Sequence, residues 1–139
     1  MIEKLTVEDS EILAQIYNES FPDSWSVETF RKMLSDDFGF GFKFTENSQI
    51  CGFILCRILF DEIEIITFAV RAPYRRKGIG HQLLHELTLY AKQHNASIFL
   101  EVAADNIAAQ SLYKSEGYQK ISVRKGYYNG TDAIVMKLS

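Results

Sequence analysis

Residues 63–102 read IEIITFAVRAPYRRKGIGHQLLHELTLYAKQHNASIFLEV, and this stretch decides the fold. An apolar run over Ile63–Val70 is followed by a basic loop with two glycines over Pro73–Gly80. Leucines at helical spacing then continue to about Asn95, and a short apolar run covers Ser97–Val102. The pattern predicts a strand, a loop, a helix and a second strand. A crossover of this kind makes the two strands parallel neighbours in one sheet.

The residues before this stretch predict a short strand, two helices and an antiparallel meander. Ile2–Leu5 suits a short strand, and Thr6 with Asp9 has the spacing of a capping box at the start of a helix. Ser26 is placed to cap a second helix. The strands and turns expected in the meander before Ile63 are Phe38–Thr45, Asn47-Ser48, Gln49–Phe60 and Asp61-Glu62.

The residues after it predict one more helix and a hairpin. Asn106 can cap the helix, and Gly117 suits the position just past its end. The hairpin is expected from Tyr118–Tyr128, a turn at Asn129-Gly130, and Ala133–Leu138. Residues 1–139 should therefore form a single α/β (α+β) domain, with a mixed antiparallel and parallel sheet of about seven strands and helices on both faces. The predicted order is β-α-α-β-β-β-α-β-α-β-β.

Composition narrows the classes of function. With 47% hydrophobic residues, 24% charged residues and a net charge of -3, the chain is typical of a globular protein without general affinity for nucleic acid or an anionic membrane. No apolar run approaches the roughly 20 residues that span a bilayer, and the N-terminus does not resemble a signal peptide, so we expect a cytoplasmic protein. Cys51 and Cys56 should point to opposite faces of one strand and remain buried free thiols.

The basic loop has the character of an anion site. A helix begins directly after it, and the first turn of a helix offers unpaired N–H groups and a positive dipole end. Glycines let the backbone approach a phosphate closely. The loop matches neither the GxxxxGK[ST] pattern nor the GxGxxG pattern, and a solvated basic turn is an equally good interpretation of the loop alone. The residues concerned are Arg75, Arg76, Lys77, Gly78, Ile79 and Gly80.

Two further residues are candidates for acid–base chemistry. Glu101 interrupts an apolar strand near its C-terminal end, where open α/β sheets bind ligands, and it is either a general base or a solvated or paired carboxylate. Tyr113 lies on the core side of its helix, and a core tyrosine is favoured on position alone over a proton donor. His81 and His85 are four residues apart, but Gln82 stands where HExxH needs Glu, so no metal site is expected.

The ordered set of these pieces resembles the GCN5-related N-acetyltransferase (GNAT) family over essentially the whole chain. The residues that carry the resemblance are Arg75-x-x-Gly78-x-Gly80, Leu100-Glu101-Val102, Asn106, Ala109, Leu112-Tyr113 and Glu116-Gly117-Tyr118. The resemblance implies that the glycine loop binds the pyrophosphate of acetyl-CoA through backbone N–H groups. It also implies that the strand ending in Phe68–Val70 splays away from its parallel neighbour and binds the acetyl and pantetheine groups. The implied cofactor-binding residues are Phe68, Ala69, Val70, Arg75, Arg76, Lys77, Gly78, Ile79, Gly80, His81 and Asn106.

Within this family the chain looks most like the bacterial ribosomal-protein alanine N-acetyltransferases. Tyr127-Tyr128 and Asp132-Ala133-Ile134-Val135-Met136 match their ending. Their Phe-Pro-Trp-Ser segment is interrupted here by Asp23-Ser24, in a loop that borders the acceptor site. The resemblance implies that Glu101 is the general base, that Tyr113 protonates the departing thiolate, and that the acceptor is a protein N-terminus. Glu62 or Glu64 would contact a cationic acceptor, although solvated strand carboxylates are the simpler interpretation.

Three alternatives stay open on this evidence. The first is an acetyltransferase of the same fold that acts on a small amine such as a polyamine or an aminoglycoside. The second is a non-catalytic acyl-CoA-binding module, which would have no need for both Glu101 and Tyr113. The third is a nucleotide-binding protein, which the absent motifs disfavour. For the acetyltransferase itself, a monomer or weak dimer that contacts neither nucleic acid nor membrane is expected.

Overall fold

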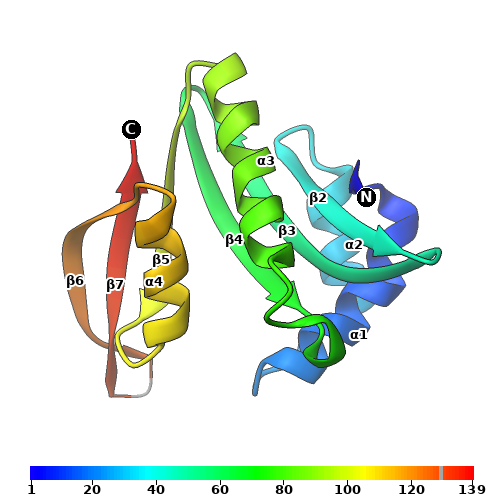
Figure 1. Ribbon diagram of the computed structural model, residues 1–139, viewed down its shortest axis with the longest axis horizontal. Helices are drawn as coiled ribbons and strands as arrows, with labels where there is room; N and C mark the ends of the chain where they lie inside the picture. The colour runs from blue at the N-terminus through cyan, green and yellow to red at the C-terminus, as the bar shows by residue number, and fades with distance from the viewer. Residues whose placement is uncertain (129) are drawn as a thin grey trace.

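In the computed structural model, the described residues 1–128 and 130–139 form one seven-stranded sheet with the strand order β1-β2-β3-β4-β5-β7-β6 (Figure 1). The strands are β1 (Ile2–Lys4), β2 (Gly39–Glu46), β3 (Gln49–Leu59), β4 (Glu62–Val70), β5 (Ser97–Ala103), β6 (Gln119–Tyr128) and β7 (Thr131–Leu138). The helices are α1 (Ser10–Ser20), α2 (Val27–Ser35), α3 (Ile79–Gln93) and α4 (Ile107–Ser115), with 3₁₀ turns at Val7–Asp9 and Ala72–Tyr74. The predicted order of elements is confirmed.

Side chains cap the first helices where the sequence predicts. The Thr6 backbone N–H donates to the Asp9 carboxylate over 2.8 Å, although this box opens a 3₁₀ turn that leads into α1. The Thr29 N–H donates to the Ser26 hydroxyl over 3.1 Å at the start of α2. Both contacts satisfy N–H groups that a helix start leaves unpaired, which fixes where the two helices begin.

The predicted antiparallel meander is formed by β2, β3 and β4. Asn47 and Ser48 make the first turn with left-handed φ angles of 52° and 64°, as tight hairpins require. The second turn falls at Phe60 and Asp61, one residue earlier than predicted, because Phe60 takes the left-handed φ of 56° and Glu62 already belongs to β4.

The prediction that Cys51 and Cys56 point to opposite faces is wrong. The register between β2 and β3 shifts by one residue at Cys51, which is therefore a β-bulge that interrupts the alternation of side chains. Both cysteines lie in the core cluster that packs against α3. They are buried free thiols, as predicted, and burial raises the pKa of the Cys56 thiol.

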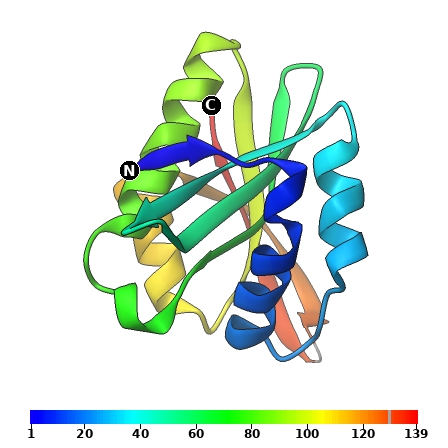
Figure 2. The same ribbon diagram turned by 90° about the vertical axis from the view of Figure 1, so that its right-hand side faces the viewer.

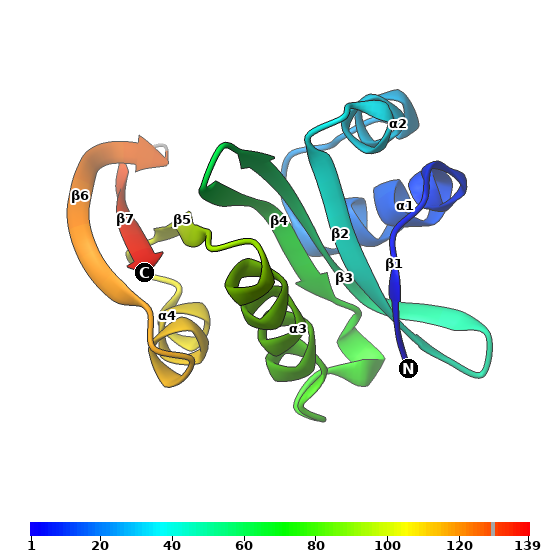
Figure 3. The ribbon, with the colours of Figure 1, turned by 90° about the horizontal axis from the view of Figure 1, so that it is seen from above.

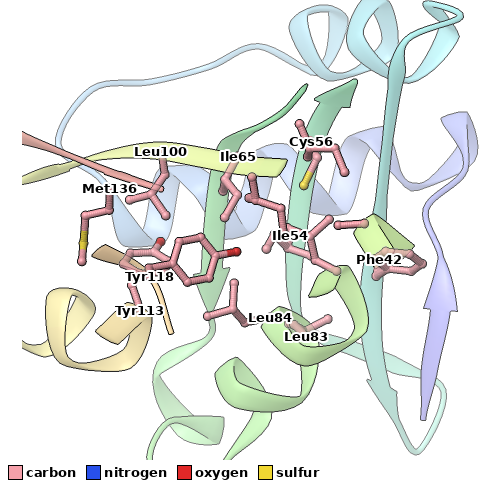
Figure 4. Close-up of a cluster of buried hydrophobic side chains, with 14 of the residues drawn as sticks. Phe42, Ile54, Cys56, Ile65, Leu83, Leu84, Leu100, Tyr113, Tyr118 and Met136 are labelled. Carbon is pink, nitrogen blue, oxygen red and sulfur yellow. The ribbon is translucent and has the colours of Figure 1, made fainter. Parts of the chain in front are cut away.

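Two helical layers cover the two faces of the sheet. Figure 3 shows α1 and α2 on one face, over β2, β3 and β4, and α3 and α4 on the other. Figure 2 shows β1 near the viewer and the β6–β7 hairpin behind it, at the far edge. On the α3–α4 face, Leu83 and Leu84 of α3 pack toward Ile54 of β3, as Figure 4 shows. In the described part of the chain, no helix covers the other face of β5, β7 and β6.

A second β-bulge lies at Ile66 in β4. Its register partners show it: Ile65 pairs with Cys56 and Thr67 with the preceding residue, Leu55. Side chains directly opposite one another share a face, so Thr67 lies on the α1–α2 face with Leu55. Beyond the bulge, Phe68 packs with the cluster on the α3–α4 face. The bulge thus turns the last residues of β4 into a new orientation.

The parallel pairing of β4 with β5 is short, and the strands then separate. Glu62–Glu64 of β4 pairs with Ser97–Phe99 of β5, and no further pair is formed in the described residues. Beyond this point β4 stays paired with β3, whereas β5 stays paired with β7. We call the separating ends, Ile65–Val70 and Leu100–Ala103, the fork (Figure 1). It confirms the expected splaying of the strand that ends in Phe68–Val70.

The C-terminal part of the fold is also as predicted. Gly117 follows α4 with a left-handed φ of 96°. The Tyr118 N–H donates to the Tyr113 carbonyl over 3.1 Å and the Gly117 N–H to the Lys114 carbonyl over 3.0 Å, which is a Schellman motif. The hairpin of β6 and β7 follows, but Asn129 of the predicted turn lies outside the described residues. Among the described helices, none has the length and apolar character of a membrane span.

Candidate functional site

The basic glycine loop ends on a helix start without a side-chain cap. Gly78 is the N-cap residue of α3, with a left-handed φ of 82° that favours glycine. No side chain caps this helix in the described structure, and its first turn holds no acidic residue. In contrast, Ser26 caps α2 and Asn106 caps α4. The first N–H groups of α3 are therefore directed at the loop, where they suit an anion.

The three cationic side chains of the loop make different contacts. Arg75 Nε donates to the Val70 carbonyl over 2.8 Å, so this side chain ties the loop to the end of β4. Lys77 Nζ lies 5.6 Å from the centre of the Tyr74 ring. Arg76 is exposed and has a left-handed φ of 63°. Arg75 thus has a bracing role that the sequence pattern does not reveal, while Lys77 and Arg76 contribute positive charge at the surface.

The end of β4 directs backbone N–H groups into the fork. The Arg71 N–H donates to the Cys51 carbonyl of β3 over 2.8 Å. Because successive peptide groups of a strand point to opposite sides, the N–H groups of Val70 and Phe68 point away from β3 and toward the fork. A thioester carbonyl placed there would find N–H donors on one side.

The loop, β4 and α4 meet on the α3–α4 face of the fork. A Cβ added to Gly80 would make ordinary contacts, 3.7 Å from the Phe68 ring and 3.5 Å from the Leu112 side chain, so the loop, β4 and α4 lie close together at this glycine. The Phe68 ring centre is 6.3 Å from that of Tyr113 on α4. The Asn106 side chain accepts from the Ala109 N–H over 3.1 Å, which confirms its interpretation as an N-cap.

Tyr113 is buried in the core cluster on this face, 7% exposed (Figure 4). The ring of Tyr118 lies 5.6 Å away, and burial raises the pKa of the Tyr118 hydroxyl. The Tyr118 hydroxyl makes no hydrogen bond within the described residues. The prediction that Tyr113 is a core tyrosine is therefore confirmed, because its ring is buried. The same ring lies close to Phe68, which is a residue of the fork.

Glu101 lies on the opposite face of the sheet from Tyr113. Its neighbours Leu100 and Val102 are buried in the α3–α4 cluster, so its own side chain points to the face that no described helix covers at β5. The side chain is 26% exposed, and Arg124 Nη1 of β6 donates to its Oε1 over 2.5 Å. Glu101 is thus a paired carboxylate at the mouth of the fork.

Two other glutamates share this face. Glu64 has a raised pKa, first because burial disfavours its charge and then because Glu101 is close, while Arg57 opposes the shift. Glu62 is exposed, and its carboxylate lies 3.9 Å from Lys137 Nζ. Of the two, Glu64 is the one that the structure brings near Glu101.

The loop between α1 and α2 is held by side chains of α1. The Tyr17 hydroxyl donates to the Asp23 carboxylate over 2.9 Å, and the Trp25 ring stacks on Tyr17 with a centroid distance of 4.4 Å. Asn18 bonds both the N–H and the carbonyl of Trp25. Asp23, which departs from the resembled motif, therefore has a structural role in fixing this loop.

The two histidines of α3 are exposed. His85 Nδ1 lies 3.6 Å from a Glu116 oxygen, and His81 lies one turn earlier, beside the glycine loop. In the described ranges, no three histidine, cysteine or acidic side chains are grouped closely enough to hold a metal ion.

Two residues at the fork are not singled out by any sequence motif. Arg124 of β6 reaches Glu101 of β5 across β7, and the sequence pattern does not predict this order of strands. Thr67 is 7% exposed, and its hydroxyl has no hydrogen-bond partner among the described residues. A polar residue in the apolar run over Ile63–Val70 is the only sequence signal for Thr67.

Comparisons with known proteins show what this chain is similar to. The model of the acetyltransferase (GNAT) family matches residues 10–118. The [ribosomal protein bS18]-alanine N-acetyltransferase of Escherichia coli is 35% identical over 124 residues, which cover 86% of this chain and 82% of that protein.

Solved structures agree as well. The crystal structure of the ribosomal-protein-S18-alanine N-acetyltransferase from Escherichia coli superposes with a TM-score of 0.93 and 31% identity, covering 99% of this chain and 92% of that one. Arabidopsis thaliana NAA60 in complex with acetyl-CoA superposes with a TM-score of 0.91 over 99% of this chain and 98% of that one, and at 20% identity it shows the shared fold.

Proposed function

This chain belongs to the acetyltransferase (GNAT) family, and from that premise we propose that it transfers an acetyl group from acetyl-CoA to the α-amine of a ribosomal protein that begins with alanine. Family membership makes it an N-acetyltransferase. The choice of acceptor rests on the similarity to the Escherichia coli enzyme, which extends over most of both chains.

One observation carries the proposal: a fork with an uncapped helix start on one face and a carboxylate on the other. In our proposal the coenzyme diphosphate binds the first N–H groups of α3, near Gly78, Ile79, Gly80 and His81, with Arg76 and Lys77 adding positive charge. The pantetheine and the thioester then lie along Phe68, Ala69 and Val70. Asn106 supports this region by fixing the start of α4.

The acceptor enters from the other face. Glu101, acting through water, removes a proton from the ammonium group of the acceptor, and the free amine attacks the thioester carbon directly. Backbone N–H groups near Val70 stabilise the charge that develops on the thioester oxygen. Tyr113 donates a proton to the departing thiolate. An α-amine has an ordinary pKa of about 8, so part of it is already neutral near pH 7.

Typical magnitudes indicate how much of the rate comes from positioning and how much from the base. Bringing two reactants together in the right orientation is worth effective molarities of about 10⁵–10⁸ M, and a general base adds about 10²–10⁴-fold. Positioning by the fork therefore supplies most of the rate, and Glu101 supplies a smaller but measurable part.

The test is acetylation of defined acceptors. We expect mass spectrometry to find acetyl groups on the N-terminus of a peptide that copies the start of ribosomal protein bS18, with the Glu101→Gln variant much slower. Glu101→Gln should also shift or remove the acidic limb of the pH–rate curve, and an unchanged limb would count against the role of Glu101 as the base. Acetylation of polyamines or aminoglycosides without acetylation of the peptide would refute the acceptor. Binding of acetyl-CoA without transfer to any amine would refute the enzyme activity.

A further inference from the structure

We propose that Arg124 is a positioning residue: it holds the carboxylate of Glu101 so that one oxygen is fixed and the other is left for the acceptor. The inference rests on the proposed role of Glu101 as the base. It adds a residue of the β6–β7 hairpin to a site that is otherwise built from β4, β5, α3 and α4.

The strand order explains why an arginine stands here. Arg124 is opposite Ala133 of β7, and Glu101 is opposite Val135 of the same strand. Two strand spacings, about 10 Å, separate β6 from β5. Only a long side chain such as that of arginine spans that distance. The contact formed is between Arg124 Nη1 and Glu101 Oε1.

Arg124 is itself held in place. Its guanidinium lies over the Tyr127 ring, 4.2 Å from the ring centre, which is close enough for a cation–π interaction. The backbone between them is fixed because the Gly126 N–H donates to Asp132 Oδ1 over 3.0 Å. Although the Arg124 side chain is 53% exposed, its head is therefore fixed between a ring and a carboxylate. The hydrogen bond to Glu101 is also the main reason for the raised pKa of Arg124.

The charges around Glu101 make Arg124 hard to replace. The carboxylate of Glu64 is close enough to Glu101 to repel its negative charge. Arg57 acts on Glu64, and Lys137 is paired with Glu62. Among the described residues, Arg124 is the cation in ion-pair contact with Glu101. It therefore stabilises the ionised carboxylate beside a second carboxylate.

The contact leaves Glu101 able to act. An ionised carboxylate has two oxygens and about four acceptor positions. Arg124 bonds Oε1, and within the described ranges no hydrogen bond to Oε2 is formed, so this oxygen is open to a water or an amine. A fixed carboxylate loses less entropy when the acceptor binds, and misplacement of a catalytic group by about 1 Å can cost about a hundredfold in rate.

The test compares Arg124→Gln, Arg124→Lys and the control Lys120→Gln, an exposed cation on the same strand. For Arg124→Gln we expect kcat to fall by about ten- to a hundredfold, with unchanged affinity for acetyl-CoA. The acidic limb of the pH–kcat/KM profile should move to higher pH, because the carboxylate loses its cation. Arg124→Lys should keep the limb near its original position and recover part of kcat. Lys120→Gln should change neither.

The outcomes that overturn the inference are distinct from failure of the proposed function. If Arg124→Gln lowers kcat without moving the limb, its role is structural only, and if it leaves kcat unchanged, it does not position the base. Either result refutes the inference while Glu101→Gln remains slow. If Glu101→Gln itself keeps full turnover, the proposed base is wrong. Should Arg124→Gln fold poorly, Arg124→Met, which keeps the length of the side chain without its charge, is measured in its place, and an unchanged kcat or an unmoved limb refutes the inference in the same way.

Discussion

Glu64 of β4 and Phe99 of β5 are the last residues that pair across the two parallel strands, and the contacts that we propose for acetyl-CoA and for Glu101 lie beyond them. Below this pair the sheet is closed by backbone hydrogen bonds. Above it, each strand keeps its other neighbour, so the opening costs only the ladder between β4 and β5. The Ile66 bulge begins two residues later and turns Thr67 toward the face that carries Glu101. The pair therefore marks the start of the fork, where we place the reaction.

Tyr113→Phe should lower kcat and leave acetyl-CoA binding intact. The ring stays in the core and only the proton donor is lost, so a fall of up to about a hundredfold is expected, the low end for acid–base catalysis, because a thiolate leaves readily. Single-turnover kinetics and calorimetry with acetyl-CoA measure the two quantities. Tyr118→Phe is the matched control, since its ring lies 5.6 Å from Tyr113. Equal losses in the two variants would contradict an acid role for Tyr113.

Gly78→Ala should lower both the stability of the protein and its affinity for acetyl-CoA. A left-handed φ of 82° costs a residue with a Cβ about 1–2 kcal/mol, although no atom lies within 4 Å of the added carbon. Gly126→Ala is the control, with a left-handed φ of 65° and equally open surroundings. Both variants should lose stability in thermal melts, but only Gly78→Ala should bind acetyl-CoA more weakly by calorimetry. Unchanged binding by Gly78→Ala would argue against the diphosphate site.

Glu64→Gln should gain stability over the parent protein as the pH rises. Burial and Glu101 raise the pKa of Glu64 above its ordinary value of 4.5, so the folded chain binds this proton more tightly than the unfolded chain. The cost of ionising Glu64 is therefore absent well below pH 4.5 and complete above the raised pKa. Denaturant unfolding at about pH 4 and about pH 7 measures the difference. Glu46→Gln, at an exposed glutamate, is the control, and a difference that does not depend on pH would contradict the prediction.

Thr67→Val should stabilise the protein. The hydroxyl is buried without a partner among the described residues, and such a group costs about 1 kcal/mol or more. Valine has nearly the same shape, so the melting temperature should rise. Thr88→Val is the control, because the Thr88 hydroxyl donates to the Leu84 carbonyl over 3.1 Å and its loss should bring no gain. If Thr67→Val melts lower than the parent, the hydroxyl has a stabilising contact.

The order of helices and strands can be predicted from the sequence because each signal is local. Caps at Ser26 and Asn106 and the left-handed Gly117 act within one or two turns. The pairing of Glu101 with Arg124 cannot be predicted in this way, because it joins two strands that are not neighbours in the sheet, and strand order is not a local signal. The shared face of Cys51 and Cys56 depends on a bulge, which shifts alternation without leaving a clear signature.

The separate approaches to the fork have a kinetic consequence. The coenzyme is expected from the α3–α4 face and the amine from the opposite one, so neither molecule blocks the route of the other. Both reactants then occupy the protein together, and no acetylated side chain is needed as a relay. Double-reciprocal plots at several fixed concentrations of the second reactant should therefore intersect, whereas parallel lines would indicate a ping-pong exchange.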